Sequence, residues 1–281
     1  MNMVIRVLMG LALVLPLAAV SPAQERWTLT VLHTNDMHSR LQPVNRFDST
    51  CSDKEQAEKQ CFGGMARVAT KAKEIMAEVR GRGGRALLLN AGDQFQGSLF
   101  YSHYKGKAEL EAMNEAGYDA SAIGNHEFDD GTGPLAEFIR GARFPLLGAN
   151  VLVERDKNLA GLVAEAAVLE RGGKRIGLVG VTTIDTPEIA SPGKDVQFSD
   201  PAASVRPVVA RMRAQGVDAV IVISHLGLLP DRAFAASVDG VDLIVGGHSH
   251  TLLSNTAQGA AGPYPVVVKS PSGHDVPIVQ A

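Results

Sequence analysis

The stretch Gly124-Asn125-His126-Glu127-Phe128-Asp129 decides how the rest of the chain is interpreted. It follows an apolar run at residues 120–123, which predicts a short buried strand. Its polar side chains therefore lie where a strand gives way to a loop, and a loop held by a rigid sheet is a common place for binding or catalysis. An Asn-His pair after glycine also occurs in turns whose side chains bond only their own backbone. Other strand ends decide between the two interpretations.

Four more runs typical of strands, at residues 27–33, 85–92, 217–224 and 241–247, also lead into polar side chains that can bind metals. These side chains are Asp36 and His38 after the first run, Asp93 after the second, His225 after the third, and His248 and His250 after the fourth. Asp36 and His38 are two residues apart, so on extended backbone they point to the same side. The Asp-x-His pair alone would indicate only a turn aspartate and a surface histidine.

Five of the eight histidines follow strand ends, namely His38, His126, His225, His248 and His250. In an open α/β sheet such ends share one edge, where ligands bind, so these residues predict one common site. His33, His103 and His274 lack this placement and are expected to be structural or solvated histidines. Glu127 and Phe128 are expected to be loop structure.

The remaining pattern is that of an α/β protein. Helices are predicted at residues 63–80, 107–116 and 134–141 and after Asp200-Pro201, where Pro207 suggests a late start or a kink. Residues 163–170 and 174–181 predict an antiparallel hairpin, residues 94–104 a loop, and residues 144–150, 264–269 and 276–279 further strands. A length of 281 residues with 45% hydrophobic content is compatible with one large domain.

The first 23 residues have the composition of a secretory signal. Arg6 precedes the apolar run at residues 7–20, and Ser21-Pro22-Ala23 places small residues where a signal peptidase cleaves. We therefore expect residues 1–23 to be a cleaved signal peptide and residues 24–281 to form the mature domain, which would be periplasmic or secreted. No second long apolar run follows, so no membrane span is expected after cleavage.

Cysteine use and charge fit that compartment. Cys51 and Cys61 enclose a polar segment, and in an oxidising space a disulfide is the simplest interpretation; two free thiols or half of a metal site are the alternatives. Loss of Arg6 with the signal leaves 26 basic against 30 acidic residues. This mild acidity argues against a polymeric nucleic acid as partner.

The types of side chain at the strand ends restrict the chemistry. Imidazoles, carboxylates and one amide without thiolates suit Zn, Mn, Fe, Co or Ni at a catalytic site, and the identity of the metal stays open. Seven candidate ligands exceed the needs of one tetrahedral ion. A shared carboxylate would allow two ions about 3.5–4 Å apart, which clamp a phosphoryl group and deprotonate a water. The motifs of serine hydrolases, P-loop proteins and His-Glu-x-x-His metalloproteases do not occur in the sequence.

Five motifs in register resemble the secreted 5'-nucleotidase family, which includes bacterial periplasmic UDP-sugar hydrolases and animal ecto-5'-nucleotidases. They are Thr34-Asn-Asp-Met-His38, Ala91-Gly-Asp-Gln-Phe-Gln-Gly97, Gly124-Asn-His-Glu-Phe-Asp129, Ser224-His-Leu-Gly227 and Gly246-Gly-His-Ser-His250. The resemblance implies a calcineurin-like metallophosphatase domain, a four-layer α-β-β-α sandwich of two mostly parallel or mixed sheets flanked by helices.

The resemblance also implies a role for each site residue. Asp36, His38 and His250 would hold one metal, Asn125, His225 and His248 the other, and Asp93 would bridge them. Some members of the family carry Gln where this chain has His250. His126 and Asp129 would form a catalytic pair, in which the His126 imidazolium stabilises charge on the phosphoryl oxygens and Asp129 orients it.

The family continues into a second domain that contacts the nucleobase, whereas this sequence stops at Ala281. We therefore expect a truncated chain whose C-terminal substrate-specificity domain is missing. The function indicated is release of phosphate from nucleoside 5'-monophosphates. The alternatives are the same chemistry on 2',3'-cyclic nucleotides, UDP-sugars, other phosphoesters or a sulfur-transfer thioester, and, less favoured, metal or partner binding without turnover.

Overall fold

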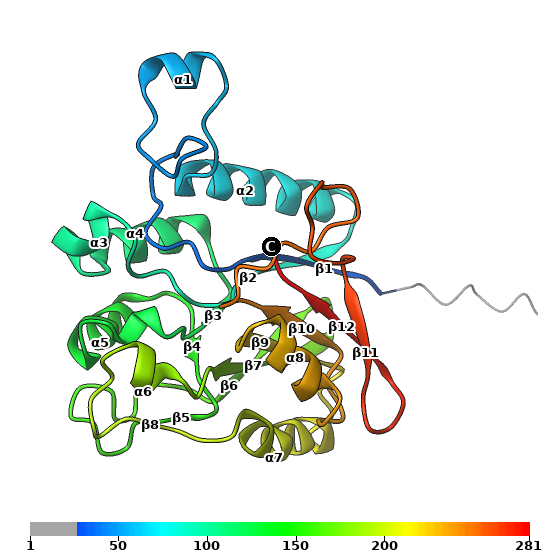
Figure 1. Ribbon diagram of the computed structural model, residues 1–281. Coiled ribbons are helices and arrows are strands. Elements are labelled where there is room, and N and C mark those ends of the chain that lie inside the picture. The colour runs from blue at the N-terminus through cyan, green and yellow to red at the C-terminus, as the bar shows by residue number, and fades with distance from the viewer. Residues whose placement is uncertain (1–26) are drawn as a thin grey trace, which may run out of the picture.

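Two β-sheets packed face to face form the centre of the molecule, with helices on both outer sides (Figure 1). The computed structural model describes residues 27–281. The predicted signal peptide at residues 1–23 lies outside the described residues. Among residues 27–281, no helix has the combination of length and apolar character that crossing a bilayer requires.

The first sheet has four parallel strands in the order β1-β2-β3-β4. They are β1 (Leu29–Thr34), β2 (Arg85–Asn90), β3 (Ala120–Ala122) and β4 (Leu146–Leu147). The helices that follow these strands or lead into them are α2 (Met65–Gly81), α3 (Leu99–Tyr104), α4 (Lys107–Ala116) and α5 (Thr132–Gly141). Gly117, with φ of 81°, ends α4 where the sequence predicts.

The second sheet has six strands in the order β11-β12-β10-β9-β7-β6. They are β6 (Ala166–Arg171), β7 (Lys174–Thr182), β9 (Ala219–His225), β10 (Leu243–Gly246), β11 (Val266–Lys269) and β12 (Asp275–Val279). The four inner strands are parallel, and both edge strands are antiparallel to their neighbours: β6 forms the predicted hairpin with β7, and β11 pairs with β12. The helices of this half are α6 (Thr186–Ile189), α7 (Pro201–Ala214) and α8 (Leu228–Ala235), and β5 (Val151–Leu152) pairs with β8 (Gln197–Phe198).

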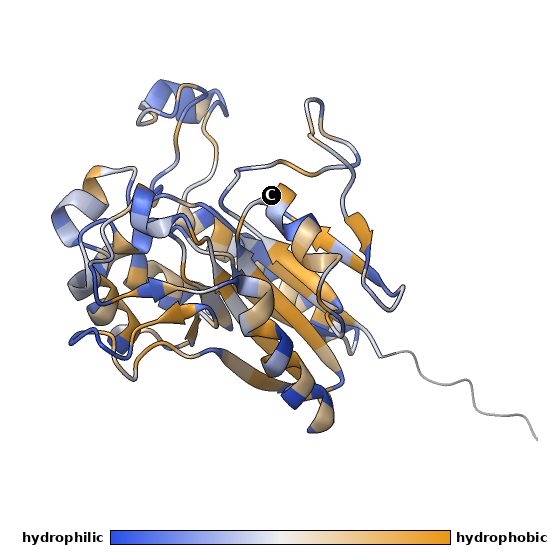
Figure 2. Ribbon diagram, turned by 60° about the horizontal axis from the view of Figure 1, so that its bottom comes forward, coloured by the Kyte–Doolittle hydropathy of each residue, from blue (hydrophilic) through white to orange (hydrophobic). Residues whose placement is uncertain are grey.

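Successive side chains of a strand point to opposite faces of its sheet, so the hydrophobic core has three layers: one between the sheets and one on each outer face. In β9, Ile221 and Ile223 face the first sheet, while Val220 and Val222 face α7 and α8. In β2, Leu87 and Leu89 face the second sheet, while Leu88 packs toward α2 and α4. Both sheets are therefore apolar on both faces, and Figure 2 shows the orange strands inside and bluer helices outside. This arrangement confirms the predicted α-β-β-α sandwich.

Short helices account for the differences from the predicted elements. The segment predicted as a loop at residues 94–104 contains α3, whose N-cap Ser98 accepts a hydrogen bond from the Phe100 N–H at 3.1 Å. That prediction was wrong because Tyr101 is the one buried residue of α3, while Leu99 and Tyr104 are exposed, so the segment shows no helical period of apolar residues. The late start suggested by Pro207 is also wrong, since α7 begins at Pro201 after the Asp200 cap.

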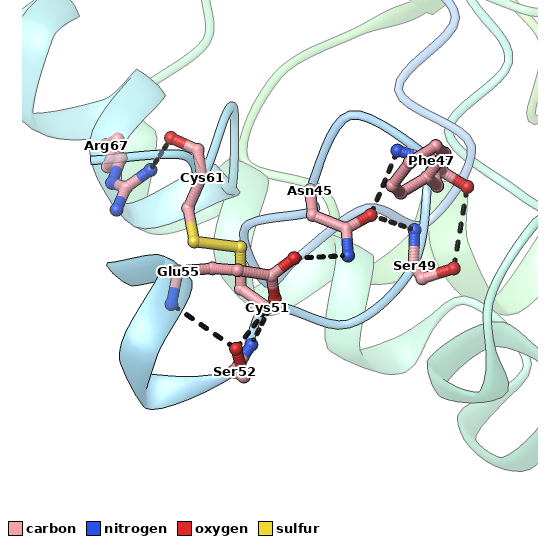
Figure 3. Close-up of a disulfide and its surroundings, with 8 residues drawn as sticks. All are labelled: Asn45, Phe47, Ser49, Cys51, Ser52, Glu55, Cys61 and Arg67. Atoms are coloured by element: carbon pink, nitrogen blue, oxygen red, sulfur yellow. Dashed lines mark hydrogen bonds between the residues drawn. A yellow bond between two sulfur atoms is a disulfide. The ribbon is translucent and has the colours of Figure 1, made fainter. Parts of the chain in front are cut away.

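The predicted disulfide between Cys51 and Cys61 is present (Figure 3). It closes the loop that carries α1 (Asp53–Ala57) and that stands away from the sandwich at the top of Figure 1. Ser52 and Glu55 form a reciprocal capping box at the start of this short helix. None of the α1 residues is buried. The disulfide and the cap therefore replace a hydrophobic core in holding the loop.

Candidate metal centre

The predicted site residues lie together at one end of the sandwich, and they come from both sheets. The ligand loops follow β1, β2 and β3 of the first sheet and β9 and β10 of the second. The expectation that all ligands lie at the edge of one sheet was therefore wrong, because the ligands come from two sheets. Because the two sheets pack face to face with the carboxyl ends of their parallel strands on the same side, five loops converge on one place.

Left-handed backbone turns most of these side chains toward the centre. Asp36, His38, Asp93, His248 and His250 have φ between 45° and 73°. This conformation costs a non-glycine residue about 1–3 kcal/mol and recurs at functional sites. These five are half of the ten non-glycine residues with positive φ in the described part of the chain. Unfavourable backbone conformations are therefore concentrated at the candidate ligands.

Asp36, His38 and His250 form the first group of candidate ligands. One atom from each lies within 4.8 Å of the others. His38 Nε2 is 3.1 Å from His250 Nε2, and His250 Nε2 is 3.6 Å from Asp36 Oδ1. The Asp36 carboxylate accepts the His248 backbone N–H at 3.0 Å, which joins the loop after β1 to the loop after β10. A cation fits this arrangement because two imidazole nitrogens and a carboxylate face one point.

Asp93, His225 and His248 form the second group, again with one atom of each within 4.8 Å of the others. His225 Nε2 lies 3.1 Å from Asp93 Oδ2 and 3.1 Å from Asn125 Oδ1. His225 Nδ1 donates to the Ala91 carbonyl at 2.7 Å, which aims Nε2 at the group.

Asp93 stands between the two groups. Its Oδ2 is 3.1 Å from His225 Nε2 and 3.8 Å from His38 Nε2. It is 1% exposed, and it shares one candidate group with His38 and another with His225 and His248. The position is the one that a carboxylate shared by two ions would need.

The protonation of these groups shows how the buried charge is balanced. Burial acts to raise the pKa of Asp93, but His225, His126 and their hydrogen bonds outweigh burial and lower it. Burial acts to lower the pKa of His225, but Asp93 and Asp36 raise it to about 9. His38 and His248 have pKa values lowered mainly by burial, so both favour the neutral imidazole that binds a metal, whereas His225 would release its proton when a metal binds. The donor set of imidazole, carboxylate and amide, without thiolate, fits divalent transition metals.

His126 and Asp129 form a pair at the edge of this cluster. His126 Nδ1 lies 2.6 Å from Asp129 Oδ2, and the ring stands edge-on to His38 with centroids 5.1 Å apart. Burial acts to lower the pKa of His126, but the bond to Asp129 and the charge of Asp93 raise it. A ligand atom of His126 also lies within 4.8 Å of His38 and Asp93. The ring is therefore close enough to act on a molecule bound at the cluster.

Glu127 is a site residue that the sequence analysis missed. It lies in the 3₁₀ helix η1 (His126–Phe128), is 2% exposed, and accepts hydrogen bonds from the backbone of two ligand loops. Burial and the charge of Asp93 raise its pKa to about 7, against the effect of those bonds. Phe128, also expected in a loop, is fully buried in the core. Neither shows a periodic pattern, because η1 is only one turn long.

The other histidines lie away from the cluster, as expected. His33 Nε2 bonds the Tyr264 hydroxyl at 2.9 Å, His103 packs edge-on against Tyr104, and His274 lies 3.9 Å from Asp242.

Comparison with known proteins agrees with this geometry. Residues 29–252 match the family model described as calcineurin-like phosphoesterase. The chain is 38% identical over 271 residues to the snake venom 5'-nucleotidase of Gloydius brevicauda, covering 94% of this chain and 45% of that protein. The chain thus spans about half the length of the curated relatives it matches.

Two solved structures share the fold. A 5'-nucleotidase precursor from Thermus thermophilus is 45% identical, with a TM-score of 0.79 over 90% of this chain and 48% of that one. An NAD nucleotidase from Haemophilus influenzae is 28% identical, with a TM-score of 0.78 over 90% of this chain and 44% of that one. The converging strand ends, the histidine and carboxylate cluster and these matches lead to one conclusion: the chain belongs to the calcineurin-like phosphoesterase family.

Proposed function

We propose that residues 24–281 form a metallophosphatase domain that releases phosphate from nucleoside 5'-monophosphates with two bound divalent metals. The observation that carries the proposal is the position of Asp93 between two groups of imidazoles, with the His126–Asp129 pair beside it. The names of the relatives, 5'-nucleotidases from snake venom and from Thermus thermophilus, support the substrate class.

Each side chain has a place in this proposal. Asp36, His38 and His250 hold the first metal, Asn125, His225 and His248 hold the second, and Asp93 contacts both. When bound, the two ions would supply positive charge to the phosphoryl oxygens and lower the pKa of a water. The buried carboxylates and the neutral His38 and His248 provide the negative charge and lone pairs that such ions need.

His126 acts on the phosphoryl group in this proposal. Asp129 accepts a hydrogen bond from Nδ1, so Nε2 is the nitrogen left to face the substrate. The raised pKa of His126 favours the imidazolium, which donates to a phosphoryl oxygen and stabilises the charge that develops there. Asp129 keeps the ring oriented.

The similarity to an NAD nucleotidase favours a second candidate, hydrolysis of the pyrophosphate bond of a dinucleotide such as NAD at the same site. For location, we propose the periplasm or the extracellular space. The disulfide and the venom source of one relative support this proposal.

A substrate panel tests the function. The purified domain, with Zn or Mn added, is assayed against AMP, UDP-glucose, NAD, cyclic AMP and an aryl phosphate. Free phosphate and nucleoside monophosphates are measured separately, because the first cleavage of UDP-glucose, NAD or cyclic AMP releases no inorganic phosphate. We expect release from AMP, and loss of that release in Asp93→Asn. Activity confined to the aryl phosphate would refute the nucleotidase assignment, and no release from any compound by a domain with two bound metals would indicate a binding protein.

A further inference from the structure

The carboxylate of Glu127 joins two of the ligand loops through four backbone N–H groups. Oε1 accepts from Gln94 at 2.7 Å and Phe95 at 3.2 Å, and Oε2 accepts from Asp93 at 3.0 Å and Gly124 at 2.6 Å. The first three donors belong to the loop after β2, and the fourth belongs to the loop after β3. One side chain therefore fixes the separation of the loops that carry Asp93 and Asn125.

The two loops are also bonded in the opposite direction. The His126 backbone N–H donates to Asp93 Oδ1 at 3.0 Å, while the Asp93 N–H donates to Glu127. Asp93 is thus held at both its backbone and its side chain, which matters because its φ of 54° is an unfavourable conformation. A Cβ on Gly124 would lie 2.1 Å from Asp93 Oδ1, so the loops are already at closest approach.

Only a carboxylate provides this set of acceptors. The four donors need two oxygens that each accept twice, and an amide has one oxygen and a nitrogen that donates. With Gln at this position, the side-chain NH2 group would face two of the backbone N–H groups, and those two donors would lose their acceptor. Asp would keep both oxygens but would be one methylene too short to reach both loops equally.

We propose that Glu127 is a positioning residue that sets Asp93 against Asn125 and His126, so that the two metal sites keep their geometry. The inference rests on the proposed function, because it takes Asp93 and Asn125 as ligands. Glu127 itself touches backbone N–H groups and acts on the ligands through them.

Cobalt binding tests this role separately from activity. Wild type, Glu127→Gln and Glu127→Asp are loaded with Co²⁺, and affinity and the visible absorption of the bound ion are measured beside kcat and KM for AMP. We expect Glu127→Gln to bind Co²⁺ about 10–100-fold more weakly with an altered spectrum. Its kcat should fall about 10–100-fold, whereas KM should change less than about threefold. Glu127→Asp should recover part of both losses because it keeps two acceptor oxygens.

Glu109→Gln is the matched control, because Glu109 is a carboxylate 1% exposed that accepts from the Ser39 hydroxyl, a bond that an amide oxygen can also accept, and from no backbone N–H of the loops after β2 and β3. It should keep the wild-type spectrum and affinity. A wild-type Co²⁺ spectrum and affinity in Glu127→Gln, or equal losses in both variants, would overturn the proposal. If Glu127→Gln does not fold, unchanged Co²⁺ binding by Glu127→Asp overturns it. Co²⁺ binding by wild type without phosphate release would refute only the proposed function, while failure to bind Co²⁺ would refute both.

Discussion

His126 is the single residue whose replacement best separates metal binding from catalysis. If it stabilises the phosphoryl charge, His126→Ala should lower kcat by about 10²–10⁴-fold while both metals stay bound. The reason is that two of the candidate groups, Asp36-His38-His250 and Asp93-His225-His248, form without the His126 ring. Metal content and kcat are measured on the same sample. His103→Ala, an exposed histidine on α3, is the control and should change neither. Parallel loss of metal and activity would make His126 a ligand.

Asp231 gives a prediction about pH and stability. It is fully buried on α8, and burial, only partly offset by the hydrogen bond from Ser224, raises its pKa to about 7. The folded protein therefore holds a proton that the unfolded chain releases near its ordinary pKa of 3.8. The stability this group contributes is present below that pKa and is lost as pH rises through about 7.

Asp231→Asn should remove that dependence. The free energy of unfolding is measured by denaturant at pH 5 and pH 8. From pH 5 to pH 8, the stability of the variant relative to wild type should rise by a few kcal/mol, since each pKa unit corresponds to about 1.4 kcal/mol. An unchanged difference between variant and wild type at the two pH values would show that Asp231 is ionised in the folded protein at both.

The residues that could be predicted from the sequence are those whose chemical type is itself the signal. Histidine and aspartate directly after apolar runs marked the cluster, and the structure brings all of them together. Glu127 could not be found in this way, because a glutamate in a polar loop is ordinary and its role depends on four backbone donors from other segments. The left-handed φ of Asp36 and His250 was equally hidden, since both are residue types common in turns.

At the level of elements, the two sheets come within hydrogen-bond distance of each other where the end of β4 meets β7. The Ala149 N–H donates to the Gly180 carbonyl at 2.7 Å, and a Cβ on Gly180 would lie 2.2 Å from the Leu147 carbonyl oxygen. Gly180→Ala should therefore destabilise the protein by about 1–3 kcal/mol or more, because backbone on both sides must move. The measurement is the midpoint of denaturant unfolding.

Gly133→Ala is the control for that substitution. Gly133 lies in the first turn of α5, and a Cβ there meets nothing within 4 Å. Its replacement should cost nothing and can gain up to about 1 kcal/mol from lower entropy of the unfolded chain. Equal midpoints for the two variants would show that the sheets separate easily at β4 and β7.

Elements with a clear apolar period were predicted well and short capped ones were not. The bounds of α4 follow from its apolar spacing and from Gly117. By contrast, α3 and α8 mix exposed with buried apolar residues, since Leu99 and Leu229 are 85% and 74% exposed while Tyr101 and Phe234 are buried, so no clear apolar period marks either helix. The order of the strands in two sheets also had no local signal, because both sheets are made of similar apolar parallel strands.

For the whole molecule, the candidate ligands connect the two sheets at one end of the sandwich. The strands of the first sheet lead into Asp36, His38, Asp93 and Asn125. The strands of the second sheet lead into His225, which ends β9, and into His248 and His250. The sheets otherwise meet mainly through apolar side chains such as Leu89 and Ile223, with a few polar contacts such as the hydrogen bond from the Ala149 N–H to the Gly180 carbonyl. Bound metals would therefore add polar links across an interface that is held by apolar packing.

Metal removal should accordingly lower the stability of the whole domain and not of one loop. Metals that bind only the folded state contribute about 2.7 kcal/mol when their free concentration is about 100 times the dissociation constant. Dialysis against a chelator should lower the midpoint of a single cooperative unfolding transition, and Zn or Mn should restore it. Asp93→Asn, which would hold metal weakly, should respond little to the chelator. A chelator-induced shift of the same size in Asp93→Asn would place the stabilising ions elsewhere on the protein.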